Sequence, residues 1–284
     1  MKILITGATG FIGSHLIVSL LENKNVIAIL KRDKTDLKNL TRYLNKIQIY
    51  QLNKDNTINS AMKIFSPDIV IHLATLYINN HRDEDIDDLI TSNISFGTHV
   101  LEAMKNNNIK YILNIGTRWQ HIGNKPYFPA NLYAATKEAF KDILIYYESQ
   151  GIQSKTIELC DTYGNEDTRK KVMDLLITAC QKKEILELTQ GEQILDLAYV
   201  RDITTFISTN IVSHVFFDNK TISLSGTIIK LRDLGAIIEK KYDGVGILKW
   251  GFKPYRINEV MNPPLYYKKI VLNQNSLQEY LNRL

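Results

Sequence analysis

The sequence has 284 residues, of which 44% are hydrophobic and 23% charged, and 35 Lys and Arg against 30 Asp and Glu give a formal net charge of +5. These values are typical of a globular protein, and the length favours one main domain with a smaller lobe. The positive charge is spread along the chain, so it predicts no nucleic-acid partner, although it is compatible with an anionic substrate. Two cysteines, Cys160 and Cys180, exclude a disulfide scaffold and a zinc site built on cysteine pairs, and no metal site is predicted.

The first residues contain only a short apolar run, at positions 3–5, before a glycine. This run is too short for a signal peptide. No apolar stretch of the chain approaches the roughly 18 residues that a membrane span needs. We therefore expect a cytoplasmic protein without a membrane partner.

Short runs of β-branched residues alternate with segments of helical period through the first half of the chain. The runs predict strands at residues 3–5, 26–30, 47–52, 69–73 and 111–115. These runs are almost continuously apolar, as strands buried on both faces of a parallel sheet are. The alternation therefore predicts an α/β fold with a doubly wound parallel sheet of the Rossmann kind.

The second half of the chain is less regular. It predicts a long helix at 131–147, a strand at 155–159, and further helices at 171–182 and 231–242. No linker rich in Pro, Gly or Ser separates the halves, so the second lobe must lie close against the first. We expect residues 1–164 to form a dinucleotide-binding domain to which some later segments return, and residues 165–284 to form mainly an interleaved substrate-binding lobe.

Three glycines, Gly7, Gly10 and Gly13, follow the first strand and precede a helix that should begin near Phe11. Glycine lets the backbone turn tightly and approach a pyrophosphate, which then rests on the amides and the positive dipole of the helix N-terminus. Because both the strand and the helix are present, this spacing predicts a dinucleotide site rather than a purely structural turn.

The end of the second strand carries Lys31 and Arg32, where many dinucleotide-binding proteins have a carboxylate for the adenosine ribose. A carboxylate would repel a 2′-phosphate, whereas a cation would pair with it. The pattern favours NADP(H). NAD(H) remains the alternative, because Asp33 could reach the ribose and two basic residues could simply form a solvated turn.

Tyr133 and Lys137 stand four residues apart on the long helix, so their side chains share one face. An ammonium beside a phenol stabilises the phenolate and lowers its pKa, which suits proton exchange between an alcohol and a ketone. Thr117 follows the fifth strand at the carboxyl edge of the sheet, where ligands of such folds bind. The three residues predict a catalytic site for an alcohol or ketone.

With these residues in place, the chain resembles the extended short-chain dehydrogenase/reductase family, in its branch of nucleotide-sugar epimerases, dehydratases and reductases. The resemblance covers essentially the whole chain, and seven motifs in the right order are more specific than any one of them. The motifs are GATGFIGSH at 7–15, HLAT at 72–75, NISFGT at 93–98, YAATK at 133–137, DTYG at 161–164, YVRD at 199–202 and PYR at 254–256.

The resemblance implies that Tyr133 is the general acid and base, that Lys137 also binds the nicotinamide ribose, and that Thr117 hydrogen-bonds the reacting oxygen. Asn53 stands where the family has an adenine-contacting Asp, which is a departure because an amide offers different donors. Together with Asn53, the cofactor contacts implied are Gly7, Thr9, Gly10, Phe11, Ile12, Gly13, Lys31, Arg32, Leu73, Ala74, Thr75, Asn93, Tyr133 and Lys137.

The substrate contacts expected from the resemblance and from charge form a second group. Arg169, Lys170 and Arg256 suit a sugar diphosphate, because cationic side chains pair with anions and a guanidinium does so with two donors. Arg201 is equally compatible with a solvated surface. The whole group is Thr75, Tyr77, Arg118, Trp119, Asp161, Thr162, Arg169, Lys170, Arg201 and Arg256.

Three further residues have roles that the sequence leaves open or assigns to the core. Trp119 and His121 are equally compatible with the sugar pocket and with the core. His72 lies inside a buried strand, which favours a core histidine over a catalytic one.

The residues after Thr117 bear on the type of reaction. The resemblance implies that 4,6-dehydratases carry Asp-Glu there as an additional acid and base, whereas this chain has Arg118 and Trp119. Neither side chain can act as an acid near neutral pH, so a dehydratase is not expected. The surrounding residues most resemble the synthases of CDP-abequose and related reductases of nucleotide-linked 4-keto-6-deoxy sugars.

We therefore expect an NADPH-dependent reductase of the C4 ketone of such a sugar, acting in the biosynthesis of a deoxysugar for surface polysaccharide. One alternative is an NAD-dependent nucleotide-sugar epimerase that keeps its cofactor. A non-catalytic dinucleotide-binding regulator is disfavoured because Tyr133 and Lys137 are both present. The resemblance also implies a homodimer through the helices at about 88–106 and 131–149.

Overall fold

Eight parallel strands form the central sheet, in the order β13-β10-β6-β5-β4-β1-β2-β3. The computed structural model describes residues 1–33, 35–218 and 220–284. Neighbouring strands bring apolar residues level with one another; Ile3, for example, lies opposite Ile27 and Ile69. The strands are β1 (Lys2–Thr6), β2 (Val26–Lys31), β3 (Ile47–Gln51), β4 (Ile69–His72), β5 (Tyr111–Thr117), β6 (Gln153–Leu159), β10 (Thr221–Ser225) and β13 (Lys269–Val271).

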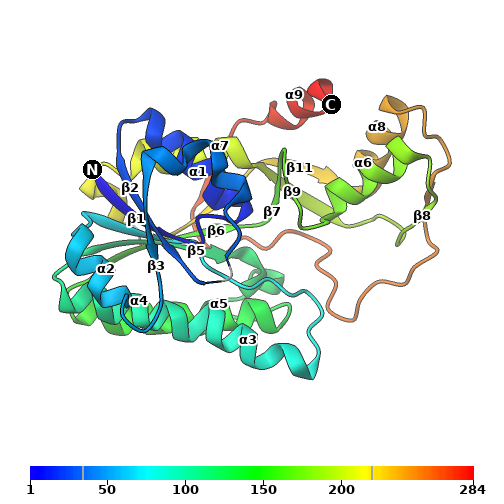
Figure 1. Ribbon diagram of the computed structural model, residues 1–284. Helices are drawn as coiled ribbons and strands as arrows, with labels where there is room; N and C mark the ends of the chain where they lie inside the picture. The colour runs from blue at the N-terminus through cyan, green and yellow to red at the C-terminus, as the bar shows by residue number, and fades with distance from the viewer. Residues whose placement is uncertain (34, 219) are drawn as a thin grey trace.

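Helices cover both faces of this sheet (Figure 1). Helices α1 (Phe11–Glu22) and α7 (Val200–Asn210) pack together on one face. Helices α2 (Ile58–Phe65), α4 (Phe96–Asn106) and α5 (Leu132–Ser149) cover the other. Each layer buries its own apolar cluster against the sheet, which explains why the strands are apolar on both sides.

The helical segment that ends in α4 has an irregular centre. It begins with α3 (Ile86–Ile90), continues through a π turn at Thr91–Ser95 and runs on as α4. A π turn accommodates one extra residue and is frequent near functional sites. Asn93, at the middle of this turn, is buried.

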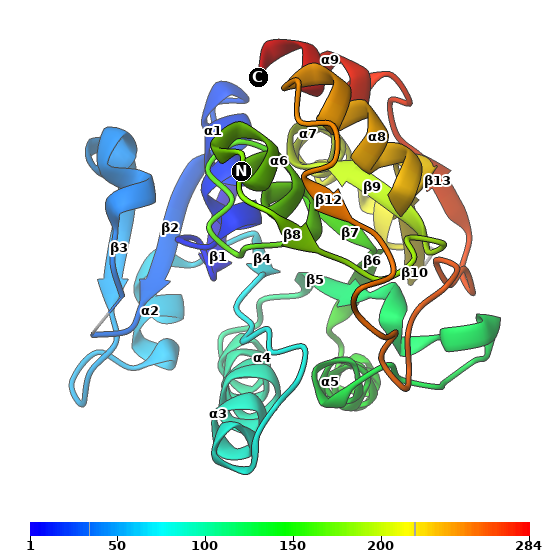
Figure 2. The same ribbon diagram turned by 90° about the vertical axis from the view of Figure 1, so that its right-hand side faces the viewer.

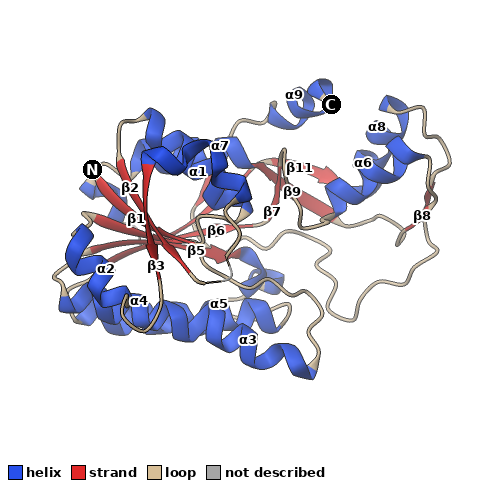
Figure 3. Ribbon diagram, viewed as in Figure 1, coloured by secondary structure: helices blue, strands red, loops and turns tan. Residues whose placement is uncertain are grey.

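A second lobe lies beyond the carboxyl edge of the large sheet (Figure 2). Helix α9 and residues of α6 and α8 share a core with Phe11 of α1, which joins the two lobes. Figure 3 shows the extended loops that connect this lobe with the sheet. Its elements are β7 (Asp161–Tyr163), β9 (Ile194–Tyr199), β11 (Thr227–Lys230), β8 (Leu186–Glu187), β12 (Leu248–Lys249), α6 (Val172–Lys182), α8 (Leu231–Lys241) and α9 (Ser276–Arg283).

The predicted doubly wound parallel sheet is confirmed, and each predicted strand and helix occurs within two residues of its expected ends. Strands β10 and β13 belong to the central sheet, and helix α7 packs on one of its faces, although all three follow residue 164. The division of the chain at that residue stays a prediction. Within the described ranges, no helix has the length and apolar content needed to cross a membrane.

Candidate active site

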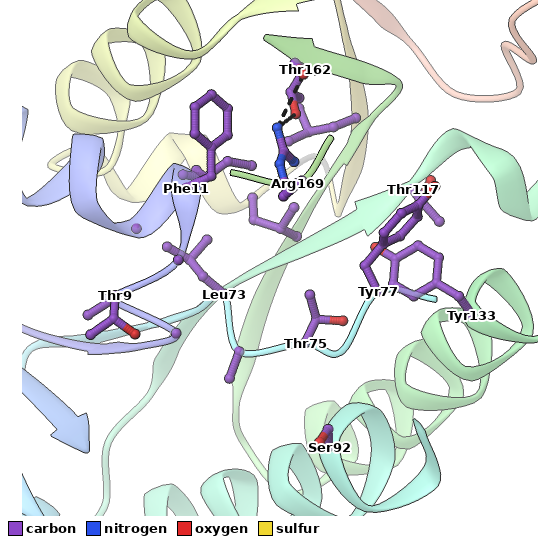
Figure 4. Close-up of a pocket in the computed structure, with 18 of the residues that line it drawn as sticks. Thr9, Phe11, Leu73, Thr75, Tyr77, Ser92, Thr117, Tyr133, Thr162 and Arg169 are labelled. Atoms are coloured by element: carbon purple, nitrogen blue, oxygen red, sulfur yellow. Dashed lines mark hydrogen bonds between the residues drawn. The ribbon is translucent and has the colours of Figure 1, made fainter. Parts of the chain in front are cut away.

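A cleft of about 540 Å³ opens at the carboxyl edge of the sheet, between the two lobes. It is lined by the glycine turn after β1, by the ends of β2, β4 and β5, by the first turns of α5, and by residues of the second lobe. Figure 4 shows Thr117, Tyr77 and Tyr133 gathered at one end and Thr9 with Leu73 toward the other. The predicted cofactor and catalytic ends therefore share one cavity.

The glycine turn has the shape that a dinucleotide requires. Gly7 has φ +67°, and a Cβ there would lie 2.5 Å from the Ala74 nitrogen, while a Cβ on Gly13 would lie 2.4 Å from the Gly7 oxygen. A Cβ on Gly10 would meet only the Gly7 oxygen, at 3.3 Å, and would otherwise project into open space. Helix α1 starts here without a side-chain cap, so its first amides face the cleft and fit a pyrophosphate.

The two basic residues at the end of β2 point in different directions. Arg32 lines the cleft, whereas Lys31 Nζ donates to the Asp33 carbonyl at 3.0 Å and lies outside the lining. Asn53 also lies outside it: its Oδ1 accepts from the Asp55 and Asn56 amides at 2.9 and 2.7 Å. Of the three residues expected to contact the cofactor, Arg32 lies in the cleft, whereas Lys31 and Asn53 do not.

The Asn93 side chain holds the loop after β4 in place by hydrogen bonds. Its Oδ1 accepts from the Thr75 hydroxyl at 2.9 Å and the Leu76 amide at 2.7 Å. Its Nδ2 donates to the Leu76 carbonyl at 3.0 Å and to the Thr136 hydroxyl on α5 at 2.9 Å. The expectation that Asn93 contacts cofactor is not met by this arrangement, because all its polar atoms are used to tie the loop to α5.

Thr117, Tyr133 and Lys137 all line the cleft, as the sequence predicts. Asn131 caps α5 by accepting from the Ala134 amide at 2.9 Å, so the helix begins one residue before Tyr133. Thr117 ends β5, and its Oγ1 accepts from the Trp119 amide at 3.3 Å. A strand end and a capped helix start thus hold the two hydroxyl groups.

Burial dominates the electrostatics of this group. It raises the pKa of the Tyr133 hydroxyl, with a further upward effect of Tyr77, while Thr75 and Arg169 act against it. The expected lowering of the Tyr133 pKa by Lys137 is not observed. Burial instead lowers the pKa of Lys137 to about 8, because its ammonium lies almost entirely out of solvent.

His72 fits the interpretation as a core histidine. Its Nδ1 lies 2.9 Å from Thr6 Oγ1, and its ring packs against those of Phe96 and Phe140. Burial, followed by the charge of Lys137, lowers the pKa of His72 to about 3. The ring is therefore neutral at physiological pH.

On the opposite wall of the cleft, the side chain of Arg169 is fixed by contacts with its neighbours. The Arg169 guanidinium lies 4.2 Å from the Phe11 ring centre and donates to Thr162 Oγ1 at 2.9 Å (Figure 4). Asp167 accepts from its Nε at 2.7 Å. Thr162 lines the cleft beside it, whereas the neighbouring Asp161 does not. Arg169 is thus fixed in place with one face toward the cavity.

Two predicted substrate residues lie away from the cleft. Arg118 is buried against Asp196, and Arg201 is exposed on α7. His121, which the sequence left open, is buried in the core, where its Nε2 lies 2.9 Å from Glu158 Oε1. Trp119, which the sequence left open in the same way, lines the cleft.

Lys171 lines the cleft in place of the expected Lys170. Its Nζ lies 5.0 Å above the Tyr77 ring, while Lys170 is exposed with φ +52°. Adjacent residues point in different directions at this turn before α6, and two successive lysines give no sequence signal to choose between them. Arg256 is bound to Glu259 at the surface, and its charge acts on Tyr77.

The chain is similar to known enzymes in sequence. Residues 3–218 match the model of the NAD dependent epimerase/dehydratase family. The chain is 28% identical to a CDP-abequose synthase of Yersinia pseudotuberculosis, over 99% of this chain and 98% of that protein. It is 25% identical to a CDP-abequose synthase of Salmonella muenchen, over 92% and 87% respectively.

The fold is also that of a solved enzyme structure. The UDP-glucose 4-epimerase of Thermus thermophilus, in complex with NAD, superimposes with a TM-score of 0.77 at 20% identity, over 93% of this chain and 90% of that one. At that identity the likeness supports the fold alone. The family model, in contrast, spans most of the chain and includes the glycine turn, Thr117, Tyr133 and Lys137. The protein therefore belongs to the NAD dependent epimerase/dehydratase family of enzymes.

Proposed function

We propose that this protein reduces the C4 ketone of a nucleotide-linked 4-keto-6-deoxy sugar with NADPH. The observation that carries the proposal is the cleft itself, in which Thr117, Tyr133 and Lys137 meet the glycine turn. The full-length similarity to CDP-abequose synthases supports the same reaction class. Arg118 and Trp119 stand where a dehydratase would need an acid and a base, which argues against dehydration.

The residues of this chain supply the proton and hold the oxygen. A bound nicotinamide would supply the hydride that reduces the ketone carbon. Tyr133, kept protonated by its raised pKa, delivers its proton to the C4 oxygen and recovers one from solvent. Since Thr117 Oγ1 already accepts from the Trp119 amide, its own hydrogen is available to the same oxygen.

The preference for NADPH rests on Arg32. This residue lines the cleft together with Thr35 and Asn39, at the end of β2 where an adenosine 2′-phosphate would lie. A guanidinium offers that phosphate two donors and a full charge. Lys31 contributes less, because its ammonium is turned to a backbone carbonyl.

The diphosphate of the sugar nucleotide would be held by cations of the second lobe. Arg169 and Lys171 line the cleft, and the charge of Arg256 reaches Tyr77 in its wall. Trp119 and Tyr77 offer aromatic surface next to the catalytic hydroxyls, with ring centres 6.2 Å apart. Such surfaces suit the apolar face of a deoxysugar.

The test is incubation of the purified protein with NADPH or NADH and a panel of CDP-, dTDP-, GDP- and UDP-linked 4-keto-6-deoxy sugars. We expect a fall in absorbance at 340 nm and a C4 alcohol by NMR, faster with NADPH. Interconversion of C4 epimers without added reduced cofactor, together with NAD released on denaturation, would support an epimerase instead. No reaction with any member of the panel would also count against the proposal.

A further inference from the structure

Arg118 is buried although it directly follows Thr117, with 2% of its side chain exposed. Its Nη1 pairs with Asp196 on β9, its Nε donates to the Pro264 carbonyl, and its Nη2 donates to the Pro263 carbonyl at 3.3 Å. All three guanidinium nitrogens therefore have acceptors. Those acceptors lie 78, 145 and 146 positions further along the chain.

The carboxylate that receives Arg118 is itself held. Asp196 is 1% exposed; its Oδ2 accepts from the Ser225 hydroxyl and its Oδ1 from the Gly226 amide, both at 2.7 Å. Hydrogen-bond donors on both oxygens fix the orientation of this carboxylate. The fixed carboxylate in turn restricts the orientation of the guanidinium that pairs with it. Arg118 thus joins the end of β5, the second-lobe strand β9 and the two prolines.

The prolines belong to a long connection, residues 252–268, which we call the strap; all of its residues are described and they form no helix or strand. Its end near Arg118 makes further contacts with the first lobe. The Leu265 amide donates to Asn124 Oδ1 at 2.8 Å, and the Tyr267 hydroxyl accepts from Lys141 Nζ at 2.8 Å. Arg118 is the buried centre of this attachment.

The other part of the strap carries Arg256. Its Nε donates to Glu259 Oε2 at 3.0 Å and its Nη2 donates to Glu259 Oε1 at 2.6 Å. Burial raises the pKa of Tyr77, which lines the cleft, and the charge of Arg256 acts against that rise.

The backbone of the strap is tied elsewhere to the second lobe. The Lys253 amide donates to the Leu188 carbonyl at 3.0 Å, and the Met261 carbonyl accepts from the Ile194 amide at 2.8 Å. The contacts around Arg118 therefore hold the strap in a defined position relative to the first lobe and to the strand end at Thr117.

We propose that Arg118 is a positioning residue that fastens the strap to the strand end carrying Thr117. In this way it sets the position of the strap, with its cation Arg256, relative to the group that would bind the reacting oxygen. Arg118 itself does not line the cleft. The inference rests on the proposed function, because it assigns Arg256 and Thr117 to opposite ends of one substrate.

Arg118→Lys is the appropriate variant. A lysine keeps the charge beside Asp196, so the fold is spared the unpaired buried carboxylate that Arg118→Ala would leave. Its single ammonium cannot reproduce the planar fork that reaches both proline carbonyls. The matched control is Arg201→Lys, at an exposed arginine on α7.

The kinetic readout separates positioning from a general structural role. In Arg118→Lys we expect the KM for the 4-keto sugar nucleotide to rise about tenfold or more, since small misplacements at a site cost large factors. The KM for NADPH should stay within about twofold, because the glycine turn and Arg32 are remote from this attachment. Equal losses for both ligands, or no change in the sugar KM, would overturn the inference.

A second readout needs no activity. Trypsin can cut the strap after Arg256, which precedes Ile257. We expect cleavage there about tenfold faster in Arg118→Lys than in wild type or Arg201→Lys, because a loosened segment opens more often. Unchanged cleavage would show that Arg118 does not fasten the strap. If the wild-type protein reduces no sugar in the panel, the proposed function fails while this measurement still decides the fastening.

Discussion

The ring of Tyr77 meets the ring of Tyr133 edge to face, with ring centres 5.0 Å apart and planes at 81°. Tyr77 thereby packs on the ring of the proposed proton donor, and after burial it is the next contribution to the raised pKa of Tyr133. The Nζ of Lys171 also lies over the Tyr77 ring. One aromatic side chain thus links the proposed proton donor with Lys171, a cation of the second lobe.

This contact predicts unequal effects of two substitutions. Tyr133→Phe should lower kcat by about 10²- to 10⁴-fold, the usual loss when a positioned acid is removed. Tyr77→Phe keeps the ring and should retain most activity, while Tyr77→Ala admits water to Tyr133 and should cost about tenfold in kcat. Steady-state rates at saturating NADPH measure both. Full activity in Tyr133→Phe would refute the assignment of the proton donor.

Lys137 predicts the alkaline limb of the pH–rate profile. Burial lowers its pKa to about 8, so the ammonium is present below that pH and disappears above it. Since Tyr133 stays protonated over the same range, kcat/KM should be level from about pH 6 to 7 and fall above about 8. In Lys137→Arg the charge persists, so the fall should move to higher pH. A wild-type rate that stays level to about pH 10 contradicts this interpretation.

Arg32 and Lys31 provide a matched pair for cofactor choice. Arg32→Ala should raise the KM for NADPH about 10- to 100-fold, the value of a lost charge-assisted contact, and change the KM for NADH little. Lys31→Ala should have a smaller effect, since its ammonium binds the Asp33 carbonyl. Initial rates with both cofactors measure the ratio. Equal sensitivity of NADH and NADPH would exclude a 2′-phosphate contact.

The buried pair of His121 and Glu158 predicts a pH-dependent stability. Burial alone would lower the pKa of His121, but the hydrogen bond and charge of Glu158 outweigh it and raise that pKa. The stabilisation is therefore complete below the unfolded histidine value of about 6.5 and is lost as pH rises through the folded value. Lys141, 3.7 Å from Glu158, keeps its charge across this range and so does not produce the difference.

Glu158→Gln should accordingly cost more stability at about pH 6 than at about pH 9, by about 1 kcal/mol or more. Urea unfolding followed by fluorescence at the two pH values gives the difference. A cost that is the same at both would mean that His121 is not charged in the folded protein.

The outer faces of α3 and α5 predict self-association. Ile145 and Tyr146 on α5 are 58% and 57% exposed, and Ile86 and Ile90 on α3 are also exposed. We expect a homodimer by size-exclusion chromatography with light scattering, and a monomer for Ile145→Glu. Ile64→Glu, at an exposed apolar position on α2, is the control that should leave the mass unchanged. A monomeric wild-type protein would refute the prediction.

Sequence patterns were sufficient for the sheet and for the shared helix face of Tyr133 and Lys137, because both depend on local spacing. Continuous apolar runs fix a parallel strand, and a spacing of four fixes one face of a helix. The burial of Arg118 could not be predicted, because its partner Asp196 is brought near only by the folded second lobe. Lys170 and Lys171 could not be told apart, since their directions follow from the backbone of a turn.

The late return of the chain to its central sheet has a consequence for truncated forms of the protein. Helix α7 packs against α1, and strands β10 and β13 complete one edge of the sheet, the last of them at Lys269–Val271. Strand β13 follows the glycine turn, Thr117, Tyr133 and Lys137 in the chain. A truncation before β13 would therefore keep all of these residues and yet leave β10 as an unpaired edge strand, which is a template for aggregation.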